Sequence, residues 1–186
     1  MDLTHTALLI IDIQNDYFPG GAFELEGSEA AGKNARAALE FFRERGLPVV
    51  HVRHESVRPG STFFLPGTPG AEIHPLVAPV PGEPVVLKHF PNSFRETELQ
   101  ATLQGLGVQR LVVAGSMTLM CVDATVRAAW DLGYAVTVLS DACAARALEF
   151  GGQKVAAASV HAAFLAALGM VYAKVESTAA FLAGAR

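Results

Sequence analysis

The sequence predicts an α/β protein with three layers, α/β/α, around a six-stranded parallel sheet. Short apolar runs recur along the 186 residues, and amphipathic segments of helical length separate them. Parallel strands need crossover connections, usually helices, so this alternation indicates βαβ units with helices on both faces of the sheet. No repeat or linker interrupts the pattern, and the length suits one domain over residues 1–186.

The first half of the chain contains two strand patterns and one helix pattern. "TALLIIDIQ" (6–14) is apolar on both alternating faces, which is typical of a strand buried on both sides. Apolar residues recur at helical spacing over 28–45, where Gly46 ends the helix, and "LPVVHVRH" (47–54) is the second strand. Residues 56–84 are rich in Pro and Gly, and a loop of this length usually carries function.

The second half continues the alternation. Four further strands are predicted at "PVVLKHF" (84–90), "VQRLVVAG" (108–115), "YAVTVLSDA" (134–142) and "GMVYAKV" (169–175). Helices are predicted at "ETELQATLQGLG" (96–107), around Cys121, over 150–168 and at "TAAFLAGA" (178–185). This order predicts a Rossmann-like sheet whose ligands bind beyond the carboxyl ends of the strands.

Composition limits the classes of partner. Charged residues make up 17% of the chain and the net charge is -4, which gives no electrostatic reason to expect nucleic acid or anionic lipid. The two cysteines are too few for a disulfide framework, and the apolar run "ALLIIDI" reaches Asp12 too early to span a membrane. No signal peptide is visible. We therefore expect a cytoplasmic protein with no nucleic-acid or membrane partner.

Three reactive side chains fall at predicted strand ends. Asp12 ends the first strand, Lys88 ends the third, and Cys121 follows the fourth in the first turn of its helix. Burying a single charge costs several kcal/mol, so the acid and the lysine are expected to pair. Carboxyl ends of parallel strands share one edge of the sheet, so the three residues are expected to meet.

These residue types suit acyl transfer. A free thiol has a pKa near ~8.5, and a helix N-terminus and an ammonium both lower it. A carboxylate within reach accepts the thiol proton and returns it to a leaving amine, while the turn before the helix offers N–H groups to an oxyanion. The set needs no metal or organic cofactor, and we expect none.

Other interpretations of the same residues stay open at this point. Free cysteine is often inert packing, a carboxylate can simply end a strand, and a lysine can extend to the surface. The three together at one sheet edge favour the functional interpretation. A nucleotide binder is disfavoured because neither G-x-G-x-x-G nor G-x-x-x-x-G-K-[ST] occurs.

Three segments give the chain a resemblance to a known family over nearly its whole length. They are "LLIIDIQNDYF" (8–18), "VVLKHFPNSFRETELQATL" (85–103) and "LVVAGSMTLMCVDATVRAAWDLGYAVTVLSDAC" (111–143). They resemble the isochorismatase-like cysteine hydrolases, which include nicotinamidases, N-carbamoylsarcosine amidases and the ureidoacrylate and streptothricin amidohydrolases. The resemblance implies the isochorismatase-like version of the fold.

The resemblance also implies an activity. Asp12 looks like the general base of the family, Lys88 like its activating lysine and Cys121 like its nucleophile. The implied function is hydrolysis of a C–N bond in a small amide or ureide through a thioester acyl-enzyme.

Four further positions take implied roles. The peptide bond between Ser116 and Met117 corresponds to a cis bond in the family, and the N–H groups of Met117 and Cys121 would then form the oxyanion hole. Gln14 and Tyr17 fall where relatives line the substrate pocket.

The chain departs from nicotinamidases in two places. They carry an Asp-x-His and a further His that bind a metal, whereas "HVRHESVRPG" (51–60) has no matching acid. His51 and His54 on one strand point to opposite faces, so we predict no metal site, although His74 lies in the long loop. Leu119 stands where nicotinamidases often carry Asp.

Two alternative functions remain. Isochorismatases proper lack the nucleophilic cysteine, so Cys121 argues against hydrolysis of a vinyl ether. A catalytically silent, hydrolase-like binding protein is the other alternative, and the intact Asp, Lys and Cys argue against it.

Two features suggest contacts between subunits. The segment around His161 is apolar on nearly every face, so we expect an interface helix and a homo-oligomer, dimer or tetramer, with His161 structural. The loop over 55–84, with Phe63 and Phe64, is expected to be either a lid or a subunit contact.

Cys143 is expected to be a buried structural thiol.

Overall fold

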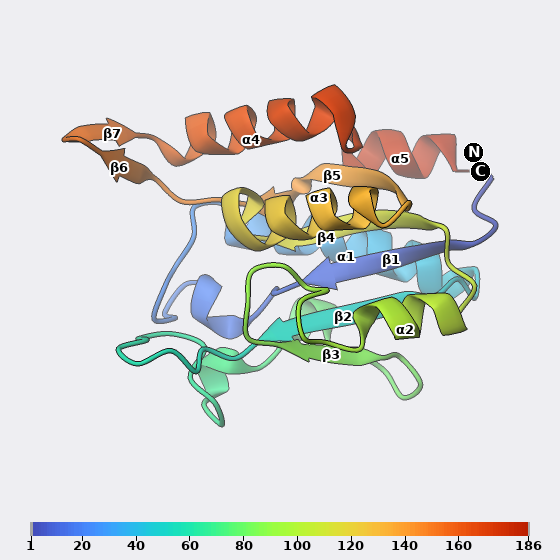
Figure 1. The fold of residues 1–186 in the computed structure, drawn as a ribbon, viewed down its shortest axis with the longest axis horizontal. Coiled ribbons are helices and arrows are strands. Elements are labelled where there is room, and N and C mark those ends of the chain that lie inside the picture. The colour runs from blue at the N-terminus through green and yellow to red at the C-terminus, as the bar shows by residue number, and fades with distance from the viewer. Residues whose placement is uncertain (1, 186) are drawn as a thin grey trace.

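The central feature of the fold is one parallel sheet between two layers of helices (Figure 1). The computed structural model describes residues 2–185 and gives the strand order β3-β2-β1-β4-β5-β8. The strands are β1 (Thr6–Ile11), β2 (Val49–His54), β3 (Val85–Lys88), β4 (Arg110–Ser116), β5 (Ala135–Ala144) and β8 (Lys174–Glu176). The predicted α/β/α class and six-stranded parallel sheet are confirmed.

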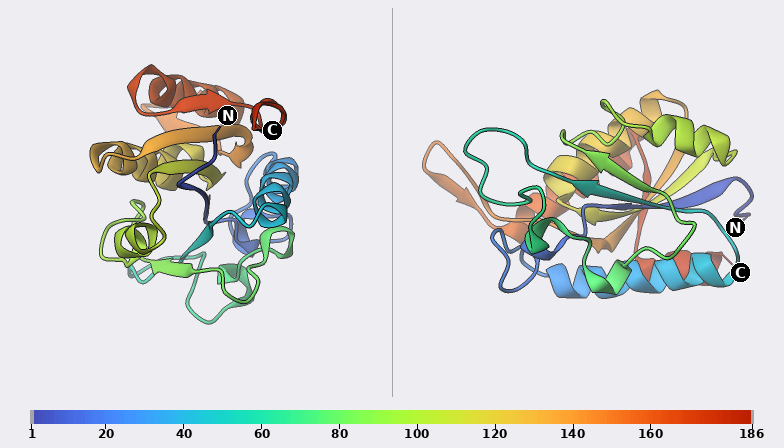
Figure 2. Two further views of the ribbon diagram at one scale, coloured as in Figure 1. Left: turned by 90° about the vertical axis from the view of Figure 1, so that its right-hand side faces the viewer. Right: turned by 90° about the horizontal axis from the view of Figure 1, so that it is seen from below.

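The helices cover both faces of this sheet (Figure 2). One layer contains α1 (Ser28–Glu44) and α5 (Thr178–Gly184), and the other contains α2 (Leu99–Gly105), α3 (Asp123–Asp131) and α4 (Ala157–Val171). Successive side chains of a strand point to opposite faces, so β1 serves both layers: Leu8 and Ile10 join the cluster under α1, and Leu9 joins the cluster under α2 and α3. This double burial explains the unbroken apolar run of β1.

A β-hairpin replaces the start of the helix that was predicted over 150–168. Strands β6 (Leu148–Phe150) and β7 (Gln153–Val155) pair antiparallel across Gly151 and Gly152, whose φ angles are 58° and 79°. Two positive φ angles in succession suit a two-residue hairpin turn, which glycine adopts without steric cost. The prediction of a helix from residue 150 was therefore wrong.

Two other boundaries differ from the prediction. Helix α4 continues to Val171, so the last strand begins at Lys174 rather than at 169. The segment around Cys121 is a single π-helical turn, η4 (Thr118–Val122), that leads into α3.

The long connection over 56–84 contains only the short 3-10 turns η2 (Pro69–Ala71) and η3 (Pro75–Val77), and a third such turn, η1 (Asn15–Tyr17), follows β1. The connection therefore has no strand or long helix of its own, as the sequence predicted. Within the described residues, the structure has no helix with both the length and the apolar character that crossing a membrane requires.

Gly115 allows β1 and β4 to approach at the carboxyl edge of the sheet. It pairs with Ile11, and a Cβ at Gly115 would lie 2.2 Å from the carbonyl oxygen of Ile11. Asp12 follows directly on β1 with φ of 51°, which turns the chain out of the strand. The absence of a side chain at Gly115 is therefore part of what places Asp12 and the turn after β4 beside each other.

We expect Gly115→Ala to lower the free energy of unfolding by at least about 2 kcal/mol, because the added methyl group meets backbone that the sheet holds in place. Urea unfolding measures the change. Gly105→Ala in α2 is the matched control, since a Cβ there meets no atom within 4 Å and alanine favours the helix. Equal stability of the two variants would contradict this account.

Candidate active site

The structure brings together the three residues that lie at the ends of different strands. The Nζ atom of Lys88 lies 2.7 Å from Oδ2 of Asp12, and both side chains are fully buried. The thiol of Cys121, which is 5% exposed, lies close enough to the carboxylate of Asp12 and the ammonium of Lys88 for both groups to shift its pKa. A carboxylate, an ammonium and a thiol therefore form one buried contact set.

The order of the strands explains why a lysine is needed on β3. Strand β2 lies between β3 and β1, so the outer strand is about 10 Å from the strand that Asp12 follows. Only a long side chain crosses that distance, and the four-carbon stem of Lys88 does so past the end of β2. Cys121 reaches the same point from β4, the other neighbour of β1.

His54 is a residue of this site that the sequence reasoning missed as a partner of the lysine. Its Nδ1 lies 3.2 Å from Nζ of Lys88, and the carbonyl of Phe90 accepts a further hydrogen bond from Nζ at 3.1 Å. Burial lowers the pKa of His54 to about 4, so the ring is neutral and Nδ1 accepts the bond. Its position at the end of β2, in register with Lys88, is the signal that would have identified it.

The charges of the site set the protonation of the sulfur. Burial alone lowers the pKa of Lys88, but the neighbouring Asp12 and Cys121 raise it above its ordinary value. Burial raises the pKa of Cys121, and Asp12 raises it further, whereas Lys88 alone acts in the opposite direction. From the sequence we considered only the helix N-terminus and the ammonium, which lower the thiol pKa, whereas burial and the adjacent carboxylate raise it and prevail.

Asp12 has few partners besides these two groups. Within residues 2–185, its one ion pair is with Nζ of Lys88, and neither carboxylate oxygen has a further hydrogen-bond partner. The carboxylate is therefore available to accept a proton from the thiol beside it.

The turn that carries the cysteine is held by local contacts. The peptide bond between Ser116 and Met117 is cis, and the carbonyl oxygen of Met117 accepts hydrogen bonds from the N–H groups of Met120 and Val122 at 3.0 and 3.2 Å. The oxyanion role of the Met117 and Cys121 N–H groups stays a prediction.

Thr118 ties this turn to two other elements. It is fully buried, its hydroxyl lies 3.1 Å from the carbonyl oxygen of Ala144 at the end of β5, and it lies 2.9 Å from Nδ1 of His161 on α4. His161 is thus a hydrogen-bonded residue of the scaffold, which agrees with its predicted structural role.

Gln14 was predicted to bind substrate, and the structure shows a different use of its amide. Nε2 donates to the carbonyl oxygens of His54 and Ala71 at 2.8 and 2.7 Å, and Oε1 accepts from the N–H of His54 at 2.8 Å. The side chain is fully buried and joins the end of β2 to η2. A substrate-binding role for Gln14 stays a prediction for which the amide offers no free donor.

Tyr17, the other predicted pocket residue, lies near the reactive groups. It is 2% exposed, and burial together with the nearby Cys121 and Asp12 raises its pKa well above the ordinary value. Its ring packs against Phe64 at 4.5 Å and Phe63 at 5.9 Å between centroids. The long loop therefore covers Tyr17 with aromatic side chains.

Asp16 holds that loop in place and was not identified from the sequence. Its carboxylate accepts hydrogen bonds from the N–H groups of Phe64 at 2.6 Å and Ala22 at 3.1 Å. A side chain at Gly70 would collide with the same carboxylate, so Gly70 lets η2 pack against it. No local sequence signal distinguishes Asp16 from a solvent-exposed acid, because its partners lie in a distant loop.

The three histidines near the predicted second strand have separate partners. Nε2 of His51 lies 2.9 Å from Glu83, His54 contacts Lys88, and the ring of His74 stacks on Phe18 at 3.6 Å. Among residues 2–185, no group of three or more His, Cys, Asp or Glu side chains is placed to hold a metal ion.

Cys143, the second thiol, lies at the end of β5. It is buried, and burial raises its pKa to about 12. It has none of the charged contacts of Cys121, which agrees with its predicted structural role.

Comparison with known proteins agrees with this geometry. A family model described as the isochorismatase domain matches residues 6–170. An uncharacterized isochorismatase family protein of Bacillus subtilis, YddQ, is 51% identical over 177 residues, covering 95% of this chain and 98% of that protein.

Two solved structures share the fold. A crystal structure from Oleispira antarctica, provisionally assigned as an isochorismatase hydrolase, has a TM-score of 0.93 and 53% identity, covering 96% of both chains. The N-carbamoylsarcosine amidase of Thermoplasma acidophilum has a TM-score of 0.80 and 26% identity, covering 93% of this chain and 96% of that one.

The charges around Cys121 predict how it reacts with iodoacetamide. In a Cys143→Ala background, we expect the alkylation rate to rise with pH through a midpoint above the ordinary thiol value of about 8.5. Asp12→Asn removes a negative neighbour of the sulfur, so it is expected to lower the midpoint. Lys88→Met removes the only opposing charge and is expected to raise it.

The midpoint, rather than the absolute rate, is the quantity to compare, because burial of the sulfur slows alkylation at every pH. Mass spectrometry of the labelled peptide follows the reaction. A midpoint below 8, unaffected by Asp12→Asn, would show that the carboxylate does not control the thiol.

Proposed function

The chain belongs to the isochorismatase-like hydrolase family, and from that premise we propose that it is a cysteine hydrolase that cleaves a C–N bond in a small amide or ureide. The observation that carries the proposal is the buried contact among Asp12, Lys88 and Cys121. The structural likeness to an N-carbamoylsarcosine amidase supports the amide class of substrate.

In the proposed acylation, Sγ of Cys121 attacks the substrate carbonyl carbon as its proton passes to Asp12. The negative charge moves from the carboxylate to the sulfur and then to the carbonyl oxygen. Lys88 contacts both Asp12 and Cys121, so the total charge of the buried set does not change during this transfer. The N–H groups of Met117 and Cys121 are proposed to bind the oxyanion.

The tetrahedral intermediate then loses its nitrogen. Asp12 returns the proton to that nitrogen as the C–N bond breaks, which releases ammonia or an amine and leaves a thioester on Cys121. Water enters, Asp12 removes its proton, and hydroxide adds to the thioester carbonyl. Collapse releases the acid product, and the sulfur recovers its proton from Asp12.

The resting thiol fits this cycle. A raised pKa means that the thiolate forms only as the proton is transferred to Asp12, at the moment when the substrate accepts the charge. Hydrolysis of a vinyl ether has no need for such a sulfur, so the contact set favours amide cleavage over that alternative.

We also propose a compartment, a substrate size and an oligomeric state for the protein. Both cysteines are free, which supports a reducing compartment such as the cytoplasm. The substrate is proposed to be a small molecule, since the contact set is buried and aromatic side chains of the long loop cover Tyr17 near it. The outer face of α4, where Met170 is 83% exposed, supports a homo-oligomer.

A screen for ammonia release tests the function. Primary amides, ureides and carbamoyl amino acids are incubated with the protein, and at least one class is expected to be hydrolysed. Cys121→Ser is expected to lower kcat at least about 1,000-fold, because a nucleophile and its base act as one unit. Cys143→Ala is the matched control and should leave kcat within about twofold.

Mass spectrometry of the quenched reaction provides a second measurement. The acyl group should add to the peptide that contains Cys121 and be absent in Cys121→Ser. Full activity in Cys121→Ser would remove the sulfur from the mechanism, and a protein inactive on every class would favour the binding-protein alternative.

A further inference from the structure

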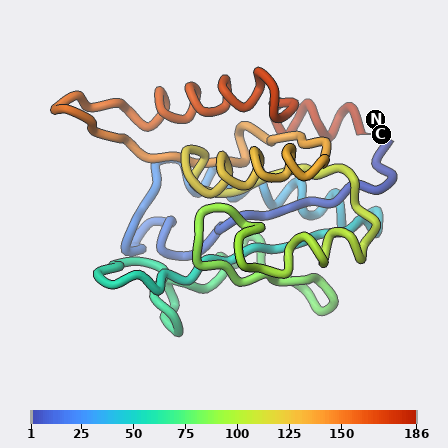
Figure 3. Tube along the Cα trace, in the orientation of Figure 1, coloured from blue at the N-terminus to red at the C-terminus, as the bar shows by residue number. Residues whose placement is uncertain are grey.

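Residues 148–155, which we call the arm, form the β6–β7 hairpin and extend away from the rest of the fold (Figures 1 and 3). All eight residues are exposed, and Phe150 next to the turn is 91% exposed. The pairing of Leu148 with Val155 and of Glu149 with Lys154 gives the hairpin two different faces. One face carries Leu148, Phe150 and Val155, and the other carries the two charges.

The apolar face of the arm is expected to pack against another surface. A two-stranded hairpin alone is marginally stable in water, and it becomes stable when its apolar face packs against another surface. Leu148 and Val155 are each 40% exposed, so their pairing covers part of their surface, but Phe150 stays 91% exposed and a phenylalanine can bury about 150–250 Å² on packing. A surface outside the arm that covers Phe150 would therefore stabilise the hairpin further.

A groove of about 400 Å³ lies at the base of the arm. It runs between the start of α1, the end of β5 and the start of α4. Its walls are made mostly of small residues, among them Ala31, Ala144 and Ala157, and Cys143 and His161 also line it. Ala145 and Ala157, which flank the arm in the sequence, both contribute to the groove.

We propose that two copies of this chain exchange arms, each placing Phe150 in the groove of the other. A two-fold axis makes the contact isologous: when one tip reaches the base of the second arm, the second tip reaches the base of the first. Because the groove lies at the base, antiparallel arms bring each tip to a groove.

The charges along the arm complement each other in this arrangement. Arg146 at its base stacks over the ring of Phe23 at 4.3 Å, and Arg146, Glu149 and Lys154 make no ion pair with any of residues 2–185. Antiparallel arms direct Glu149, near the tip of one arm, toward Arg146 at the base of the other. A foreign protein would have to supply a matching charge pattern, whereas a second copy already carries it.

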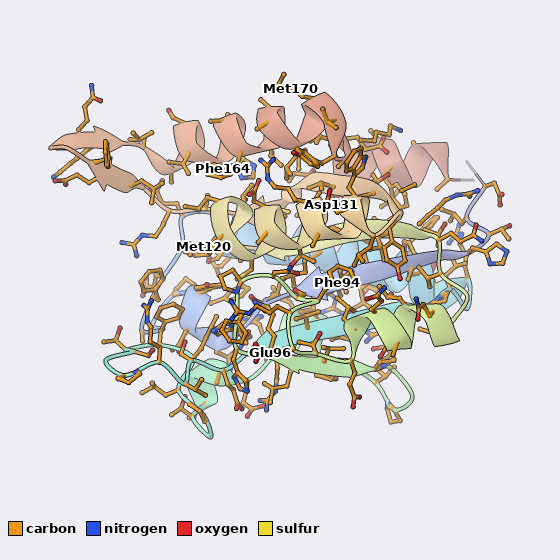
Figure 4. The ribbon with its side chains drawn as sticks, viewed as in Figure 1. Phe94, Glu96, Met120, Asp131, Phe164 and Met170 are labelled. Carbon is orange, nitrogen blue, oxygen red and sulfur yellow. The ribbon has the colours of Figure 1, made fainter. Side chains whose placement is uncertain are left out.

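The arm and the groove together are also large enough to form an interface between two copies. The arm and the residues that line the groove number about twenty in each copy, which is the lower end of the range for a standard interface. The outer face of α4 is separate from this surface, and Figure 4 shows Met170 near the far end of that helix, pointing away from the sheet.

Light scattering after size exclusion tests the exchange. Wild type at about 10 µM is expected to have an even multiple of the chain mass, and Phe150→Glu is expected to halve that mass. Val57→Glu, at a 61% exposed position outside the arm and groove, is the matched control and should behave as wild type. A monomeric wild type, or a Phe150→Glu variant with unchanged mass, would overturn the proposal.

Disulfide trapping tests the position of the tip. In a background that carries Cys121→Ser and Cys143→Ala, Phe150→Cys places a thiol at the tip and Ala158→Cys places one at an exposed position of the groove. Oxidation is expected to give a covalent dimer on a non-reducing gel, with the 150–158 peptide pair identified by mass spectrometry, and leaving out Ala158→Cys is expected to remove that pair. Absence of the pair from the oxidised protein would show that the tip lies elsewhere.

Discussion

The ion pair between Lys88 and Asp12 is the interaction on which the rest of the site depends. Both charges are fully buried, and removing either would leave the other unpaired at a cost of about 3–5 kcal/mol. The pair spans the end of β2 and thereby connects β3 to β1, so the same contact joins strands and sets the charge beside the sulfur. His54 and the carbonyl of Phe90 take further hydrogen bonds from the ammonium and fix its direction.

The ion pair has no net charge and the thiol beside it is neutral, so the proposed reaction starts from a buried site whose net charge is zero. Each proposed step moves a proton or an electron pair within a set whose total charge is constant, which matters because net charge is costly in a buried site. The surrounding structure then has one remaining task, which is to hold the groups in contact. Asp16 and Gln14 do so for the long loop, and Thr118 does so for the turn that carries Cys121.

The sequence was sufficient to predict the sheet and the meeting of Asp12, Lys88 and Cys121 at its edge, because both leave local signals. Strands buried on two sides show unbroken apolar runs, and an acid, a lysine or a cysteine at the end of such a run contrasts with its neighbours. His54 and Asp16 were not predicted to belong to the site, because their partners, Lys88 and Phe64, are distant in the sequence. The hairpin of the arm was not predicted, because its turn depends on the positive φ angles of Gly151 and Gly152. The apolar residues that follow the turn are typical of a helix, so the sequence pattern extended that helix too far toward the N-terminus. The direction of the Cys121 pKa shift could not be predicted, because it depends on the burial of the sulfur, which is known only once the fold is known.

The protonated state of Cys121 has a consequence for the lifetime of the protein. Peroxide attacks thiolates, and the first product, a sulfenic acid, can be carried on to forms that no thiol reverses. A sulfur that is 5% exposed and keeps its proton is a poor target for that attack. The burial and charges that are proposed to delay formation of the nucleophile until substrate is present therefore also limit oxidation of the resting sulfur.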